Sequence, residues 1–193
     1  LKECLSKGAD RAFLMTDRAV GGSDTLATSY ILSCVYRKLG PFDAVFCGKQ
    51  AIDGDTGQVG PEMAEHLGIP QVTCALEARL DGEWLEVLQQ EEDCQRQVRV
   101  ALPCLTTFTK PAFNPRFPTI RRKMAAARAG IACLDAGKLP GLDRDRVGLS
   151  GSPTRVKRTF VPQLCKSGVT IQGEDVPAAA RLLAGVISET VGN

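Results

Sequence analysis

A glycine-rich run near the middle of the chain has the residue types of a loop that binds phosphate. The run reads GKQAIDGDTGQVGP and begins at Gly48. Pro61, at its end, suits the first turn of a helix, whose free N–H groups attract anions. The run also contains a hydroxyl group and glycines that permit close backbone approach to a ligand, namely Gly54, Thr56, Gly57 and Gly60.

Two aspartates in the same run argue against a phosphate ligand. The charges of Asp53 and Asp55 repel phosphate unless their carboxylates cap backbone amides or bind ribose hydroxyls. The glycine spacing also matches neither the dinucleotide-binding pattern G-x-G-x-x-G nor the Walker loop. The residues alone therefore leave two alternatives open, a phosphate site and a capped turn.

A second polar run, GGSDTLATS from Gly21 to Ser29, stands where a strand is expected to end and a helix to begin. Either Ser23 or Asp24 is suited to cap that helix. The hydroxyls of Thr25 and Thr28 lie on an exposed helix face or point toward a ligand. Both alternatives fit the residues.

Other catalytic chemistry has little support. His66 is the single histidine, and no Ser/His/Asp set, Cys/His pair or acid pair is recognisable. The eight cysteines contain no CxxC pair, which is typical of reduced thiols in a cytosolic protein, and we expect no metal site.

A formal net charge of +2 without a long basic run argues against nucleic acid as a partner. Because no apolar stretch is long enough to cross a membrane, we expect a cytoplasmic protein.

The elements around both polar runs predict an α/β fold. Apolar strands are expected over residues 11–16, 43–48 and 71–80, with helices over 23–40 and about 60–67 between them. This alternation of strand and helix predicts a parallel sheet. Ligands bind such sheets outside the carboxyl ends of the strands, where both runs are expected.

The pattern changes in the second half of the chain. Residues 76–110 are expected to form an antiparallel extension of the sheet, with the dipeptide Asp81-Gly82 in its first turn. A proline-punctuated loop over residues 111–118 follows and runs into a helix, TIRRKMAAARA. A short strand, GIACLD, then closes a first domain at residue 135.

Residues 136–193 are expected to form an irregular arm that ends in an amphipathic helix from about 175 to 190. The chain opens on what reads as the end of a helix stopped by Gly8, and it has no initiator Met. We therefore expect the N-terminus to be truncated.

Several segments together resemble the β subunit of electron-transfer flavoprotein. They read GADRAFLMTDRAVGGSDTLATSYIL, GKQAIDGDTGQVGPEMAEHLGIPQVT, LPCLTTF, NPRFPTIRRKM and VGLSGSPTRVKRTF. The resemblance covers essentially the whole chain and implies a parallel-sheet, nucleotide-binding domain of the adenine nucleotide α-hydrolase type. It also implies that the family's first two strands, with part of the adenine pocket, are missing.

The resemblance assigns nucleotide-binding residues by matching position. In the family, the glycine-rich loop wraps the phosphates of an adenine nucleotide. Members that hold a second FAD in the β subunit imply that Asp24, Thr25 and Thr28 lie near the flavin ring. The matching loop residues here are Gly48, Lys49, Gln50, Ala51, Ile52, Asp53, Gly54, Asp55, Thr56, Gly57, Gln58, Val59 and Gly60.

The resemblance also implies two protein partners. The family's docking loop inserts one exposed aliphatic residue into a pocket of an acyl-CoA dehydrogenase or a similar flavoprotein. Here residues 111–124 are the candidate docking loop and that residue is Ile120, with Arg116 and Arg121 beside it. The alternative is a solvent-exposed helix start without a partner. The arm over residues 136–193 is implied to pack on an FAD-carrying α subunit.

The function implied is that of an electron carrier, with no turnover on its own. Between FAD and AMP we favour FAD, because Gly54 and Gly57 leave space along a pyrophosphate and the hydroxyls near Asp24 suit a flavin ring. The flavin-binding branch of the family includes bifurcating complexes. The alternative function is a stand-alone adenine-nucleotide sensing module without a redox role.

Overall fold

The computed structural model describes residues 1–110, 115–161 and 176–191, without the side chains of 189–191. The chain forms two compact units, Leu1–Arg155 and Val156–Asn193. The first unit contains both polar runs. In the second, the described helix is α6 (Val176–Val191), which matches the predicted terminal helix and exposes Leu183 and Ile187.

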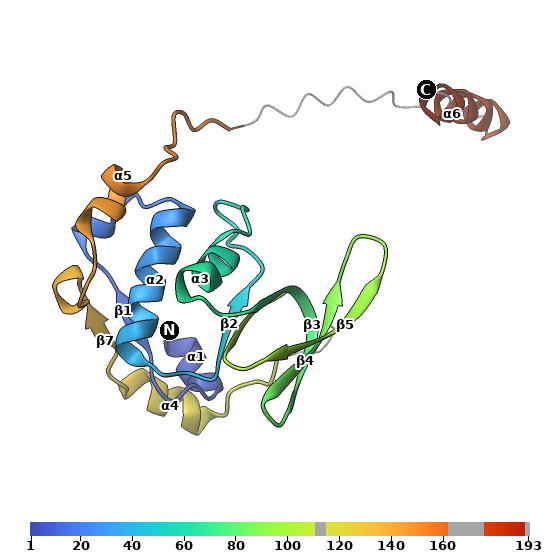
Figure 1. Cartoon of the computed structure of the whole chain (residues 1–193). Coiled ribbons are helices and arrows are strands. Elements are labelled where there is room, and N and C mark those ends of the chain that lie inside the picture. Colours follow the sequence, from blue (N-terminus) through green and yellow to red (C-terminus); the bar gives the residue numbers. More distant parts are fainter. Residues whose placement is uncertain (111–114, 162–175, 192–193) are drawn as a thin grey trace. The chain divides into compact units, whose positions relative to one another are not determined.

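A mixed five-stranded sheet forms the centre of the first unit (Figure 1). Its parallel part is β2–β6–β3, and its antiparallel part is β3–β4–β5. The sheet therefore confirms the predicted α/β class with an antiparallel extension. The strands, in sheet order, are β2 (Ala44–Gly48), β6 (Cys104–Phe108), β3 (Gln71–Asp81), β4 (Trp84–Gln90) and β5 (Gln95–Ala101).

One part of the predicted extension lies elsewhere in the sheet. Residues 104–108 were expected to continue an antiparallel strand, whereas β6 is the parallel strand between β2 and β3. Pro103 separates β5 from β6, and proline cannot donate a ladder hydrogen bond. Cys104, Leu105 and Thr106 are fully buried, as in a central strand.

The first predicted strand belongs to a separate sheet. β1 (Phe13–Met15) pairs in parallel with β7 (Ala132–Leu134), and among the described residues it has no pairing with β2. A strand–helix–strand unit does not require its two strands to be neighbours, so the local pattern did not decide this arrangement.

Two helices place the polar runs. α2 (Thr25–Leu39) begins after Asp24, whose carboxylate accepts a hydrogen bond from Ala27 N–H at 3.0 Å. α3 (Val59–Leu67) packs on α2 and on β6. Gly60 permits this packing, because a Cβ there would lie 2.5 Å from Thr107 Cγ2 of β6.

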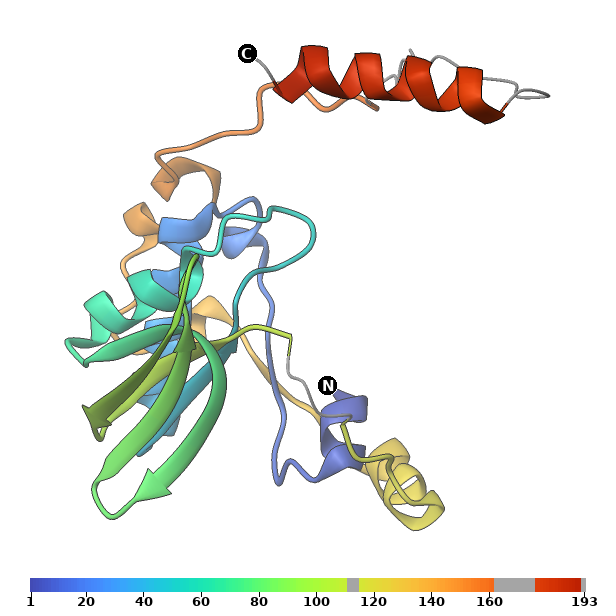
Figure 2. The same ribbon diagram turned by 90° about the vertical axis from the view of Figure 1, so that its right-hand side faces the viewer.

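A second pair of helices lies apart from the sheet. α1 (Lys2–Lys7) packs along α4 (Ile120–Arg128), as Figure 2 shows at the lower right. Lys2 Nζ donates hydrogen bonds to the carbonyl oxygens of Ala127 and Ala129, near the end of α4. This contact places a cation where the helix dipole is negative.

Residues 136–155 contain more regular structure and more buried residues than the irregular arm that the sequence predicted. They contain short helical turns, and Leu139 and Val147 are buried in a cluster with Tyr30 and Ile31 of α2. The first compact unit therefore continues past the predicted boundary at residue 135. The turns are η2 (Ala136–Lys138), η3 (Arg144–Arg146) and α5 (Gly148–Gly151), and an earlier one, η1 (Arg18–Val20), follows β1.

Candidate nucleotide-binding site

The glycine-rich run follows β2 as an exposed loop that leads directly into α3. Its first amide, Lys49 N–H, donates to the Phe108 carbonyl of β6 at 2.8 Å, so the loop starts at the carboxyl edge of the parallel strands. Residues 48–56 are exposed, whereas Gly57 is half-buried and Gly60 is buried. The loop thus has the location that the sequence predicted for a ligand site.

Asp55 organises this loop through its own hydrogen bonds. Its carboxylate accepts a hydrogen bond from Gln50 Nε2, and its N–H donates to the Ala51 carbonyl at 3.0 Å. The residue has a φ of 55°, which aspartate tolerates better than most side chains. One of the two carboxylates that opposed a phosphate ligand is therefore engaged within the loop.

The glycines of the loop fit a closely approaching phosphate group. A Cβ built at Gly48 or Gly54 would meet no atom within 4 Å, so the backbone there faces open space. Gly57 has a φ of 66°, a conformation that favours glycine. Gly60 differs, because its contacts are with Thr107 and Leu105 of the sheet. Its observed role is helix packing.

The second polar run meets this loop in space. Thr25 Oγ1, at the first residue of α2, donates to Gln58 Oε1 at 3.0 Å, and Glu62 Oε1 lies 3.5 Å from the same hydroxyl. Thr28 lies one turn further along α2 and is half-buried. The two runs, which residues 30–47 separate in the sequence, therefore line one region at the start of α2 and α3.

Asp24 is engaged by more donors than helix capping requires. Besides Ala27, Thr154 donates to its Oδ2 from both the backbone N–H (2.9 Å) and the hydroxyl (2.8 Å). Partial burial raises the pKa of Asp24, but these hydrogen bonds outweigh burial and lower the pKa below its usual range. The carboxylate is thus charged, and it accepts three hydrogen bonds from protein groups.

Sequence reasoning missed Ser152 and Thr154 as neighbours of the site. The motif SGSPT was recognised only through the family resemblance, because Ser and Thr in a Gly/Pro-rich segment carry no positional signal of their own. The one signal in the sequence was Asp24 itself. A carboxylate at an N-cap has lone pairs beyond the one that the cap uses, so it can accept further hydrogen bonds from a neighbouring segment.

The predicted docking residue is on the surface. The Ile120 side chain is 79% exposed at the first position of α4, beside Phe117, which is 92% exposed. Arg116 and Arg121 are exposed as well. Thr119 caps α4 by accepting a hydrogen bond from Arg122 N–H at 3.3 Å. Residues 111–114 of the predicted docking loop lie outside the described residues.

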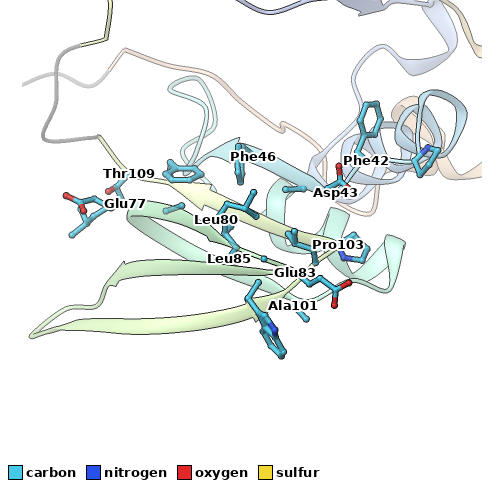
Figure 3. A pocket seen from close by; sticks show the side chains of 18 residues that line it. Phe42, Asp43, Phe46, Glu77, Leu80, Glu83, Leu85, Ala101, Pro103 and Thr109 are labelled. Carbon is cyan, nitrogen blue, oxygen red and sulfur yellow. The ribbon is translucent and has the colours of Figure 1, made fainter.

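A large apolar groove lies on the sheet face that α3 does not cover (Figure 3). Side chains alternate along a strand, so Phe46 and Phe108 face this groove while Cys47 and Thr107 face α3. Its volume is about 1160 Å³. None of the residues predicted to bind nucleotide or flavin lines it, so the groove is distinct from the candidate site.

Within residues 1–110, 115–161 and 176–191, no cluster of three or more His, Cys, Asp or Glu side chains could hold a metal ion. No helix in these ranges is long and apolar enough to pass through a membrane.

The fold and the loop after β2 define an α/β domain of the adenine nucleotide α-hydrolase-like class. A model of the electron transfer flavoprotein domain matches residues 1–138. The chain belongs to the β subunits of electron-transfer flavoproteins, which carry electrons together with an α subunit.

Similar proteins come from several organisms. The electron transfer flavoprotein subunit beta of Megasphaera elsdenii is 45% identical over 91% of this chain and 67% of its own length. The acryloyl-CoA reductase electron transfer subunit gamma of Anaerotignum propionicum is 41% identical, over 91% of this chain and 68% of its own. The caffeyl-CoA reductase-Etf complex subunit CarD of Acetobacterium woodii is 39% identical, over 98% and 72% respectively.

Proposed function

We propose that the loop of residues 48–60 and the start of α2 bind an adenine nucleotide, which is FAD, with AMP as the alternative. The observation that carries this proposal is the hydrogen bond of 3.0 Å between Thr25 Oγ1 and Gln58 Oε1, because it joins the two polar runs into one region. Bound FAD would supply the redox chemistry. The chain contributes the backbone that approaches the phosphates and the hydroxyls near the flavin.

Several features of the loop support a nucleotide phosphate there. Open space at Gly48 and Gly54 admits a ligand against the backbone, and Asp55 is held by Gln50 instead of facing outward unpaired. Val59 begins α3, so amides at the start of a helix stand next to this backbone. Thr56, Gln58 and the amides of Val59 and Gly60 are the groups that we assign to the phosphates.

The protein partner that we propose is a flavoprotein acting on acyl-CoA compounds. Two relatives are named as subunits of acryloyl-CoA and caffeyl-CoA reductase complexes, which supports this class. Ile120 serves as the docking anchor, since its side chain is exposed and the binding energy of an interface is concentrated in a few side chains that fill pockets on the partner. The second unit, which includes α6, packs on the α subunit and so completes the heterodimer.

Counting the nucleotides of the purified heterodimer tests the proposal. We expect two FAD molecules per heterodimer after extraction, one of them released when the loop is altered. One FAD with one AMP per heterodimer would show that the ligand is AMP. A colourless homodimer, formed even when a cognate α subunit is produced in the same cell, would instead support a nucleotide-sensing module.

A further inference from the structure

Residues 148–154, here called the clasp, are held on the start of α2 by reciprocal hydrogen bonds. Gly148 N–H donates to Ser23 Oγ at 2.9 Å, and Asp24 N–H donates to Ser152 Oγ at 2.8 Å. Ser152 Oγ in turn donates to the Gly148 carbonyl at 2.7 Å. Gly148 and Ser152 of the clasp are thus bonded to two consecutive residues, Ser23 and Asp24.

The clasp also fits tightly against the loop before α2. A Cβ at Gly148 would lie 2.4 Å from the Ala19 carbonyl oxygen, so only glycine fits there. A Cβ at Gly22 would lie 2.7 Å from the Leu149 side chain. Ser152 is 5% exposed. This close packing distinguishes the clasp from a segment that merely passes over the surface.

The start of α2 connects the clasp to the nucleotide loop. Asp24 binds Thr154 of the clasp, and its neighbour Thr25 binds Gln58 of the loop. Figure 1 shows α5 and the loop after β2 at the same end of α2. We therefore expect that displacing the clasp moves Asp24 and, with it, the adjacent Thr25, whose hydroxyl bonds Gln58.

We propose that Asp24 is a positioning residue and not a ligand of the flavin, and that its bonds to Thr154 make the clasp a third segment of the nucleotide site. The proposal rests on nucleotide binding by the loop of residues 48–60. Asp24 Oδ1 accepts from Ala27 N–H and Oδ2 accepts both donors of Thr154, so protein groups already use three of the roughly four lone-pair sites of the carboxylate. The Thr25 hydroxyl, by contrast, lies at the junction of the two segments.

Variants of both partners test the proposal in the purified heterodimer. Thr154→Val removes the hydroxyl donor, and Asp24→Asn keeps an acceptor for the Ala27 N–H while losing one for Thr154. We expect Thr154→Val to weaken FAD and AMP binding about tenfold and Asp24→Asn by a similar or larger factor, measured by calorimetry on heterodimer stripped of the β-subunit nucleotide. Thr154→Ser, which restores the hydroxyl, should bind within about threefold of the unaltered protein.

Hydrogen exchange gives a readout that general destabilisation would not reproduce. Added nucleotide should slow exchange at the Thr154 amide in the unaltered protein and should fail to do so in Asp24→Asn. Two matched controls remove similar caps elsewhere. Thr119→Val removes the hydroxyl cap of α4, and Asp135→Asn alters the carboxylate that caps η2. Both controls should keep normal affinity.

Three other results would overturn the proposal about the clasp. If Thr154→Val and Asp24→Asn bind nucleotide as the unaltered protein does, the clasp is only structural and the proposal is wrong, while nucleotide binding by the loop stands. If Thr154→Ser loses affinity as much as Thr154→Val, packing and not the hydroxyl is responsible, which also overturns it. If the unaltered heterodimer binds neither FAD nor AMP at this site, both proposals fail together.

Discussion

At the scale of single residues, Gly57 is the glycine of the nucleotide loop that has a positive φ. Its φ of 66° disfavours a β-branched side chain whatever the available space. We predict that Gly57→Val distorts the loop at a cost of about 1–3 kcal/mol, which weakens FAD or AMP binding by roughly 10- to 100-fold. Isothermal titration calorimetry of the heterodimer measures the effect.

The control for Gly57 is a glycine with the same backbone conformation far along the chain. Gly82, in the turn between β3 and β4, has a φ of 59° and open space around it. Gly82→Val should lower stability while leaving nucleotide affinity unchanged. Equal affinity in both variants and in the unaltered protein would exclude the loop as the phosphate site.

A variant of Ile120 and a matched control test the predicted docking surface. Its side chain is exposed, so Ile120→Ala should leave folding and bound flavin unchanged while slowing electron transfer with the acyl-CoA-type flavoprotein partner about tenfold or more. Stopped-flow absorbance of the flavin measures the rate. Leu80→Ala is the matched control, because Leu80 is also an exposed aliphatic residue but lies on β3. Equal rates in the two variants would contradict the docking role.

At the scale of elements, the contact between α3 and β6 is set by one glycine. Gly60→Ala would place a methyl group 2.5 Å from Thr107 Cγ2, so the helix must shift at a cost of roughly 1–3 kcal/mol. We predict a corresponding loss of unfolding free energy in urea. Adding Thr107→Ser should restore most of it, because serine lacks Cγ2 but keeps the hydroxyl that accepts from Cys74 N–H. No recovery in the double variant would refute this account.

The link between the N-cap of η1, Asp17, and η2 predicts a pH effect. The carboxylate of Asp17 accepts hydrogen bonds from Ala19 N–H at 2.9 Å and from Ala136 N–H at 3.0 Å, and these bonds lower the pKa of Asp17. The folded pKa lies below the unfolded value of about 3.9, so the stabilisation is complete above that pH and is lost as pH falls through the folded pKa.

Comparing Asp17→Asn with the unaltered protein measures this contribution. Between pH 6 and about pH 3, the difference in urea midpoint between the two proteins should shrink as the carboxylate becomes protonated. A difference that stays constant over this range would show that the Asp17 charge contributes nothing.

At the scale of the whole molecule, we predict separate roles for the two compact units. The first unit, Leu1–Arg155, has its own clusters of buried residues, whereas α6 in the second exposes apolar side chains that include Leu183 and Ile187. We predict that changing both residues to Asp leaves the unfolding of the first unit unchanged but abolishes heterodimer formation. Size-exclusion chromatography with the α subunit provides the measurement, and a heterodimer of normal stability would contradict the role of the arm.

The sequence by itself determined the local elements of this protein, because their signals lie within a few residues. The N-cap at Asp24, the stop at Gly8 and the turn at Asp81-Gly82 follow from side-chain capping and from glycine's access to positive φ. Hydrophobic runs were sufficient to predict most of the strands, the longer helices and the α/β class, but not the short helical turns η2, η3 and α5. The exposed loop after β2 was likewise predictable, since a buried strand must end where glycines and aspartates begin.

The tertiary structure alone decided which elements became neighbours. β6 was mistaken for part of the antiparallel extension, because a buried apolar run fits either pairing until its partners are known. The bond from Thr25 to Gln58 spans 33 residues, and that from Thr154 to Asp24 spans 130. No local propensity specifies contacts over such distances, because they form only when the buried faces of α2 and α3 have packed together and Leu139 and Val147 have joined the α2 cluster.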